Sequence, residues 1–153
     1  MRKKIAQTFT NLLAHIIFST KDRVPSIRPE LQSDLHAYLG GIIRNLQGQA
    51  LRVNGMPDHV HLLVWLPPTV AIAEALRVLK ANSSRWVHES QGHSTFAWQA
   101  GYGAFSVSQS NVSRVVKYIE DQARHHHRMS FQEELLAFLK KNHIAYDERY
   151  IWQ

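Results

Sequence analysis

The chain has 153 residues, of which 44% are hydrophobic and 20% are charged, a balance typical of a single soluble domain with one core. It contains no cysteine, which excludes disulfides, zinc–thiolate sites and thiol nucleophiles, so any bound metal must rest on His, Asp, Glu or amide ligands. The formal charge of +6 favours polyanionic partners such as nucleic acid, and ten histidines exceed what a solvated surface needs.

No segment of the sequence predicts a membrane anchor or a second domain. Residues 1–4 are basic, as at the start of a signal peptide, but polar residues such as Gln7 and Asn11 interrupt the apolar region that should follow. No apolar run reaches membrane-spanning length. Because no repeat and no Pro/Gly/Ser-rich linker divides the chain, we expect one domain over residues 1–153. The absence of cysteine fits a reducing cytoplasm, which is the location that we expect.

The first half of the chain predicts a strand, a helix and a hairpin. Residues 12–19 (LLAHIIFS) form a continuous apolar run, typical of a strand buried on both faces, and a polar loop follows over 20–28. Pro29 suits a first helical turn, and apolar residues at spacings of three and four predict an amphipathic helix that ends at Gly48. Residues 51–54 and 59–66 then predict two strands joined by a turn at 55–58.

The second half predicts one more strand and three helices. A helix is expected over about 70–89, and a strand over 96–107 that two glycines interrupt. A further helix is expected over about 110–128, and the capping-box pattern that starts at Ser130 begins the last one, over about 130–142. The order of elements predicts an α+β, ferredoxin-like split βαβ fold: an antiparallel sheet with helices on one face and a C-terminal helical extension.

His59 and His61 begin the strand at 59–66 and are candidate metal ligands. Alternation along a strand places both imidazoles on one face, within reach of a single ion, while Val60 lies on the other. The pattern alone is weak, because ten histidines in 153 residues give roughly 0.6 HxH triplets by chance. A hydrogen-bonded pair of structural histidines is the commoner source of a lone HxH triplet in a strand.

Tyr118 and Gln122 lie on a polar edge of the helix expected at 110–128. Its apolar stripe consists of valines, an isoleucine and an alanine, whereas Tyr118, Gln122 and Arg114 lie off that stripe. A tyrosine that packs at the boundary of the core, with its hydroxyl in water, and a solvated glutamine remain alternatives.

The helix at 70–89 carries polar residues on a face separate from its apolar stripe. Arg77, Lys80 and Ser84 lie on this polar face, and Arg114 occupies a comparable position on the later helix. These four side chains are candidates for contacts with DNA phosphates. The alternative is an ordinary solvated helix surface.

Three segments, MPDHVHLLVWLPP, WQAGYGAFSVS and YIEDQARHH, together resemble the small single-tyrosine transposases of the IS200/IS605 type, including those associated with repetitive extragenic palindromes. The resemblance extends over nearly the whole chain. It assigns His59 and His61 to the family's HUH pair, with Val60 as the bulky residue between them, Tyr118 to the nucleophile, and Gln122 to the third metal ligand.

This resemblance implies an enzyme that cleaves and rejoins single-stranded DNA at hairpin-bearing element ends through a 5′-phosphotyrosine. It further implies Mg²⁺ or Mn²⁺ as cofactor, a homodimer with composite active sites, and action at the nucleoid of a bacterium or archaeon. Ligand chemistry by itself equally permits zinc, nickel or iron, because imidazole suits those ions better than magnesium. Asp58, next to His59, is a candidate for orienting a ligand.

Two other functions fit the same residues. A replication or conjugative nickase uses the same HUH and tyrosine chemistry, but generally within a longer chain of several domains. The second is a catalytically idle module that binds DNA hairpins. The presence of all four candidate residues, His59, His61, Tyr118 and Gln122, argues against this function. A hydrolase with an HxHxH strand is excluded, because position 63 is leucine.

Overall fold

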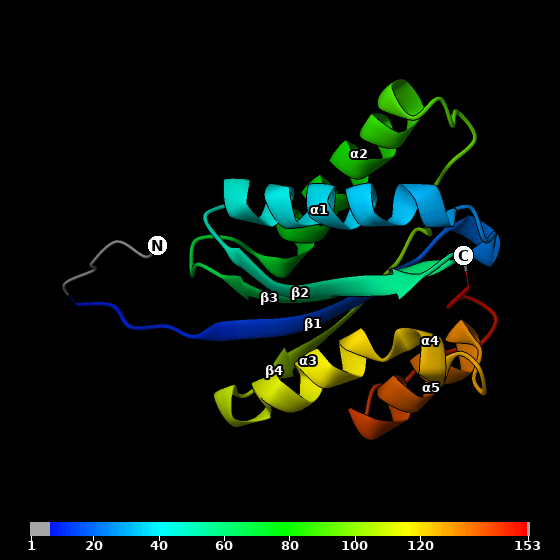
Figure 1. Ribbon diagram of the computed structural model, residues 1–153. Coiled ribbons are helices and arrows are strands. Elements are labelled where there is room, and N and C mark those ends of the chain that lie inside the picture. Colours follow the sequence, from blue (N-terminus) through cyan, green and yellow to red (C-terminus); the bar gives the residue numbers. More distant parts are fainter. Residues whose placement is uncertain (1–6, 153) are drawn as a thin grey trace.

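The computed structural model describes residues 7–152, so the basic segment 1–4 lies outside the described residues. Figure 1 shows a sheet between two layers of helices. The strands are β1 (Leu12–Ser19), β2 (Gln49–Met56), β3 (His59–Leu66) and β4 (Gly103–Val107). The α-helices are α1 (Pro29–Asn45), α2 (Ile72–Ser90), α3 (Val112–Glu120), α4 (Gln122–His125) and α5 (Phe131–Lys141), with short 3-10 helices at Lys21–Arg23 and Gln109–Asn111.

The four strands pair in the order β2-β3-β1-β4, and every pairing is antiparallel. The helices α1 and α2 cover one face of this sheet, and α3, α4 and α5 lie against the other (Figure 1). The ferredoxin-like α+β sheet with a C-terminal helical extension is therefore confirmed. The extension packs on the face that the two crossover helices leave open.

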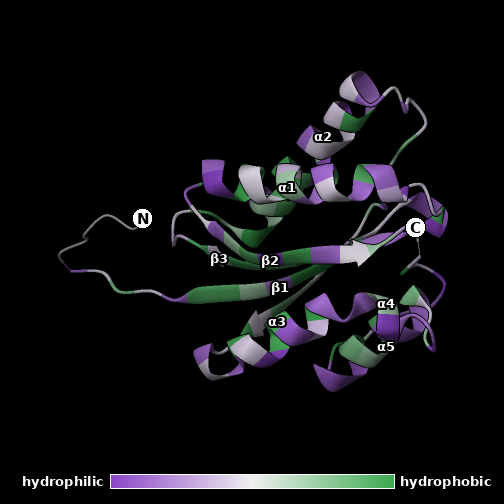
Figure 2. Cartoon of the chain, in the orientation of Figure 1, coloured by the Kyte–Doolittle hydropathy of each residue, from purple (hydrophilic) through white to green (hydrophobic). Residues whose placement is uncertain are grey.

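Alternate side chains of β3 point to opposite faces of the sheet and therefore lie in different layers. Val60, Leu62, Val64 and Leu66 are buried in the core beneath α1 and α2. His59 and His61 point the other way, and both are fully buried beneath the C-terminal helices. Figure 2 shows hydrophobic residues gathered along the strands and polar residues on the outward faces of the helices. One strand thus anchors the core and also presents the histidine pair.

The strand expected over 96–107 is shorter, because only residues 103–107 form β4. Phe96 and Trp98 are buried core residues, but they reach the core from a loop in which Trp98 makes a single isolated bridge to Thr20. The ammonium of Lys80 donates to the carbonyl oxygens of residues 99, 100 and 101. These carbonyls are thereby satisfied without a neighbouring strand.

The single helix expected over 110–128 is divided at Asp121 into α3 and α4. The amide of Asn54 donates to the carbonyl oxygens of Ile119 and Glu120, at 2.9 and 3.3 Å, and so competes for acceptors that a continuous helix would use. After α4 the chain turns, and α5 begins at the predicted capping box, in which Ser130 and Glu133 bond reciprocally. Among residues 7–152 no helix is both long and apolar enough to cross a membrane.

Candidate active site

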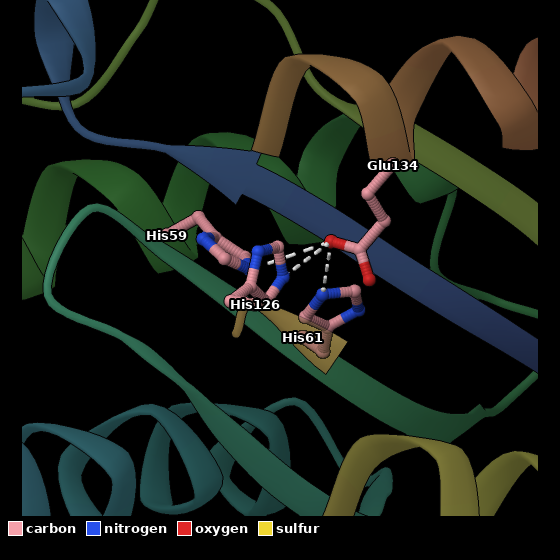
Figure 3. A group of neighbouring side chains, drawn as sticks. All are labelled: His59, His61, His126 and Glu134. Atoms are coloured by element: carbon pink, nitrogen blue, oxygen red, sulfur yellow. Dashed lines mark hydrogen bonds and ion pairs between the residues drawn. The ribbon is translucent and has the colours of Figure 1, made fainter. Parts of the chain in front are cut away.

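Glu134 of α5 lies at the centre of a group of buried histidines. Its carboxylate oxygen Oε1 is 3.1 Å from Nε2 of His61, 3.1 Å from Nε2 of His126 and 3.4 Å from Nε2 of His59. Figure 3 shows the three rings converging on this oxygen, two from β3 and one from the segment after α4. The four donor atoms lie within 4.8 Å of one another, so this group could hold a metal ion.

Tyr118 and Gln122 reach the same site from α3 and α4. Gln122 is fully buried, and its Oε1 atom lies 3.2 Å from Nε2 of His59. The hydroxyl of Tyr118 donates a hydrogen bond to the second carboxylate oxygen of Glu134. The Tyr118 ring stacks on His125, with the ring centroids 4.3 Å apart. The structure therefore brings together the four residues that the sequence singled out, His59, His61, Tyr118 and Gln122.

The two histidines of β3 are held by partners on their other ring nitrogens. Nδ1 of His59 lies 2.7 Å from Oδ1 of Asp58, and Nδ1 of His61 lies 2.8 Å from Nε2 of His15. Such contacts fix the orientation of an imidazole and direct its remaining nitrogen toward the ligand side. As expected from its position, Asp58 contacts one of the candidate ligands.

Burial and the carboxylate of Glu134 together set the protonation of the site. Burial raises the pKa of Glu134, but hydrogen bonds from His126, His59 and His61 outweigh it and hold that pKa far below its usual range. Burial lowers the pKa of His59, yet the contacts with Asp58 and Glu134 reverse the effect and raise it to about 9. These contacts therefore favour the charged, doubly protonated form of His59, and a bound metal ion would compete with its extra proton.

The pKa of Tyr118 is shifted in the direction that disfavours its phenolate. Burial raises this pKa, and the hydrogen bond to the charged Glu134 raises it further. A positive charge placed beside Glu134 would oppose both effects. The residues present fit a divalent cation, since three imidazoles and a carboxylate present donor atoms within 4.8 Å of one another, and the amide oxygen of Gln122 lies 3.2 Å from Nε2 of His59.

A cavity of about 300 Å³ opens beside the tyrosine, between α3 and α5. Apolar side chains form much of its wall, and Arg114 and Lys141 add positive charge. Its lining residues are His15, Arg114, Val115, Tyr118, Met129, Glu134, Ala137, Phe138 and Lys141. Arg114, a candidate DNA contact from the sequence, thus lies next to the candidate nucleophile.

The other three candidate DNA contacts lie on α2, which covers the face of the sheet opposite to α3, α4 and α5 (Figure 1). Arg77 is exposed and pairs with Glu74, with 2.6 Å between Nη2 and Oε1, while Lys80 is engaged with backbone carbonyls. Ser84 is half-buried. None of the three faces the candidate active site, and their contact with DNA remains a prediction.

Three residues of the site were not predicted from the sequence: His15, His126 and Glu134. Two of them carry a readable signal. His15 is a polar residue within an apolar strand, and Glu134 lies beside Phe131 and Leu135 on the buried face of α5. His126 carries no such signal, because it is flanked by His125 and His127 and all three are alike in sequence.

Comparisons with known proteins agree on one family. Residues 8–122 match the family described as "Transposase IS200 like". The transposase of insertion sequence element IS200 from Salmonella typhimurium is 28% identical over 130 residues, which cover 78% of this chain and 82% of that relative. The ISDra2 transposase TnpA of Deinococcus radiodurans is 30% identical over 114 residues, covering 71% and 81% of the two chains.

Solved structures share the fold. A crystal structure described as a transposase from Deinococcus radiodurans superposes with a TM-score of 0.65 and 27% identity, over 79% of this chain and 98% of that one. A REP-associated tyrosine transposase bound to a REP hairpin has a TM-score of 0.60 and 15% identity, over 82% and 74%, which shows a common fold alone. With three quarters of its length matched and the HUH pair, tyrosine and glutamine assembled, the chain belongs to the IS200-like transposase family.

Proposed function

We propose that this protein cleaves and rejoins single-stranded DNA at hairpin-bearing ends of an element, with Tyr118 as nucleophile and a divalent metal as cofactor. The observation that carries the proposal is the convergence of His59, His61, Gln122 and Tyr118 on one buried site from three separate elements. The carboxylate of Glu134 connects the tyrosine hydroxyl to the histidines within that site.

In the proposed site His59, His61 and Gln122 would hold Mg²⁺ or Mn²⁺. A divalent ion bound there would supply positive charge to polarise a non-bridging phosphate oxygen and to offset repulsion between the phosphodiester and the incoming phenolate. Asp58 and His15 keep the two imidazoles in the orientation that this binding requires.

Tyr118 performs the strand cleavage. As its hydroxyl proton leaves to solvent water, its oxygen, positioned by Oε2 of Glu134, forms a bond to phosphorus, and the bond from phosphorus to the 3′-oxygen breaks. The leaving oxygen takes a proton from water, which yields a 3′-hydroxyl and a 5′-phosphotyrosine. Because the phosphodiester energy is retained in that linkage, attack by another 3′-hydroxyl rejoins DNA without ATP.

DNA hairpins are the proposed partner. The REP-associated relative of the same fold is bound to such a hairpin, and this chain carries a formal charge of +6. The cavity beside Tyr118 has Arg114 and Lys141 in its lining, where they can meet the phosphates that flank the scissile bond. Arg77, Lys80 and Ser84 would contact DNA only on a second surface, across the sheet.

We further propose that the protein acts as a homodimer with composite active sites, at the nucleoid in the cytoplasm of a bacterium or archaeon. Within one chain Tyr118 already lies against its own site. Exchange of the helix α3 between two copies would keep the same contacts and place each tyrosine in the partner's site.

The test is incubation of the protein with hairpin-bearing single-stranded oligonucleotides taken from the DNA that flanks its gene, in the presence of Mn²⁺. Denaturing electrophoresis should show a covalent protein–DNA adduct with the wild type and none with Tyr118→Phe. The exposed Tyr150 offers a matched control, and Tyr150→Phe should form the adduct as the wild type does.

Two outcomes would count against this proposal. Equal cleavage by Tyr118→Phe would show that another group is the nucleophile. Tight hairpin binding without an adduct, across oligonucleotides covering both flanks, would instead favour the idle DNA-binding module.

A further inference from the structure

Glu134 and His126 both lie after the segment that matches the family, which ends at residue 122. Nevertheless the two side chains are integral to the site. Glu134 is 1% exposed, and its carboxylate meets three imidazoles and the hydroxyl of Tyr118. A buried carboxylate with so many polar contacts costs free energy unless those contacts compensate for its lost hydration. Its place in the site therefore calls for a chemical role.

The distances around Glu134 match the edges of a coordination shell. Metal–nitrogen and metal–oxygen bonds of about 2.1 Å place neighbouring ligands about 3.0 Å apart in an octahedron and about 3.4 Å apart in a tetrahedron. Oε1 of Glu134 lies 3.1, 3.1 and 3.4 Å from the three histidine nitrogens. The Oε1 atom of Gln122 lies 3.2 Å from His59 Nε2, which extends the same pattern.

The second oxygen of the carboxylate holds the nucleophile. The hydroxyl of Tyr118 donates to Oε2 of Glu134, while Oε1 faces the three imidazoles. One side chain of α5 therefore spans the candidate metal position and the attacking oxygen. A ligand arranged in this way fixes the distance between ion and nucleophile, and a tyrosine anchored only by its own helix lacks that constraint.

We propose that Glu134 is a metal ligand whose second oxygen positions Tyr118, and that His126 completes the ligand set with His59, His61 and Gln122. This inference rests on the proposed function. Three imidazoles with one carboxylate form a donor set that suits Mn²⁺ or Zn²⁺ better than Mg²⁺, because magnesium favours carboxylate, carbonyl and water oxygens. The helix α5 is then part of the catalytic site.

The competing explanation is that Glu134 occupies the place of the ion as a charge partner of the protonated His59, and must leave before metal binds. The two explanations predict opposite effects of neutralising the carboxylate. Glu134→Gln weakens metal binding when Glu134 is a ligand, and strengthens it when Glu134 is an obstacle.

Isothermal titration of the full-length protein with MnCl₂ tests this proposal. We expect Glu134→Gln and His126→Gln each to weaken Mn²⁺ binding at least tenfold. Matched controls are Glu89→Gln on the exposed side of α2 and His127→Gln, both at exposed positions, and both should bind Mn²⁺ within twofold of the wild type. Circular dichroism and thermal melting of each variant establish that it is folded, so that a loss of binding is assigned to the ligand.

A reference variant separates this inference from the proposed function. His61→Ala should abolish Mn²⁺ binding. Normal Mn²⁺ binding by that variant would contradict the proposed metal site as a whole. Loss of binding by His61→Ala, together with unchanged or tighter binding by the folded Glu134→Gln, would overturn the assignment of Glu134 while leaving the proposed function in place. Unchanged binding by His126→Gln would remove His126 from the ligand set.

Discussion

At the scale of single residues, the histidines of this chain differ in what their two ring nitrogens contact. His59 and His61 have a partner on each nitrogen, so their rings are oriented and their remaining donors are shared with Glu134. His36 of α1 differs from both, because its Nε2 is buried with no hydrogen-bond partner among the residues that the structure describes. Its burial carries a cost in stability rather than a function.

His36 predicts a pH dependence of folding that is independent of the active site. Burial lowers its pKa from 6.5 to about 4. As the pH falls through this window the unfolded chain binds a proton that the folded chain does not, so the free energy of unfolding decreases below pH 6.5 and the loss is complete below pH 4. At pH 5 this loss amounts to roughly 2 kcal/mol, and His36→Leu should remove it.

Urea unfolding of wild type and His36→Leu at pH 8 and pH 5 measures this effect. The free energy of unfolding of His36→Leu, relative to that of the wild type, should be higher at pH 5 than at pH 8. The exposed His127 serves as control, since His127→Gln should follow the wild type at both values. An equal difference between wild type and His36→Leu at pH 8 and pH 5 would contradict the assigned pKa.

Only some residues of the site could be predicted from local sequence patterns. His59 and His61 follow from the alternation of a strand, and Tyr118 with Gln122 from helical spacing, because both patterns depend on neighbours within a few positions. Glu134 and His126 enter the site through tertiary packing of α5 and of the turn before it. That packing depends on how two helices dock on a sheet, which no local pattern encodes.

At the scale of elements, the C-terminal helix has the most clearly encoded start. Ser130 accepts from the backbone N–H of Glu133 at 3.2 Å, and the Glu133 side chain accepts from the backbone N–H of Ser130 at 3.1 Å. The capping box was therefore a reliable signal. By contrast, the division between α3 and α4 was not predicted, because it depends on Asn54, more than sixty positions earlier in the chain.

Weakening this cap should disturb the site from a distance. Ser130→Ala removes the hydrogen-bond acceptor at the start of α5 and should lower the free energy of unfolding by about 1 kcal/mol. Since Glu134 lies one turn beyond the cap, the same change should weaken Mn²⁺ binding severalfold by loosening the helix that carries the carboxylate.

Urea unfolding and Mn²⁺ titration of Ser130→Ala check the two effects. Ser113→Ala, at an exposed position on α3, is the matched control and should leave Mn²⁺ binding as in the wild type. A destabilised Ser130→Ala protein with normal Mn²⁺ affinity would show that the start of α5 is independent of the site.

At the scale of the whole molecule, the sheet separates the main hydrophobic core on one face from the candidate active site on the other. The larger buried cluster lies between the sheet and α1 and α2, whereas the histidines and the smaller cluster around Phe131 lie beneath the C-terminal helices. The order of strands and helices was predictable, because a split βαβ pattern permits few arrangements. The sequence left open whether one active site is built from one chain or from two, because the same contacts form within a chain or between two.

Mixing two inactive variants distinguishes these arrangements. Tyr118→Phe keeps the histidines, and His61→Ala keeps the tyrosine. When equal amounts of the two are mixed and allowed to exchange subunits, a composite site combines the intact half of each. Random pairing makes half of the dimers mixed, and each mixed dimer has one intact site of two, so adduct formation should recover to about a quarter of the wild-type level. Denaturing electrophoresis of the mixture measures the recovery, with each variant alone as the blank. Absence of any recovery after verified exchange would show that each chain uses its own Tyr118.

The separation of His61 and Glu134 by 73 positions has a further consequence, for the timing of synthesis. A chain emerging from the ribosome delivers all four strands before α5 has been translated. During that interval the strand-borne histidines are present without the carboxylate that we assign to both metal and nucleophile. The proposed metal site is therefore complete only after the last helix has been translated. A prematurely terminated chain that lacks α5 has the histidine pair but no Glu134, and we expect it to be inactive.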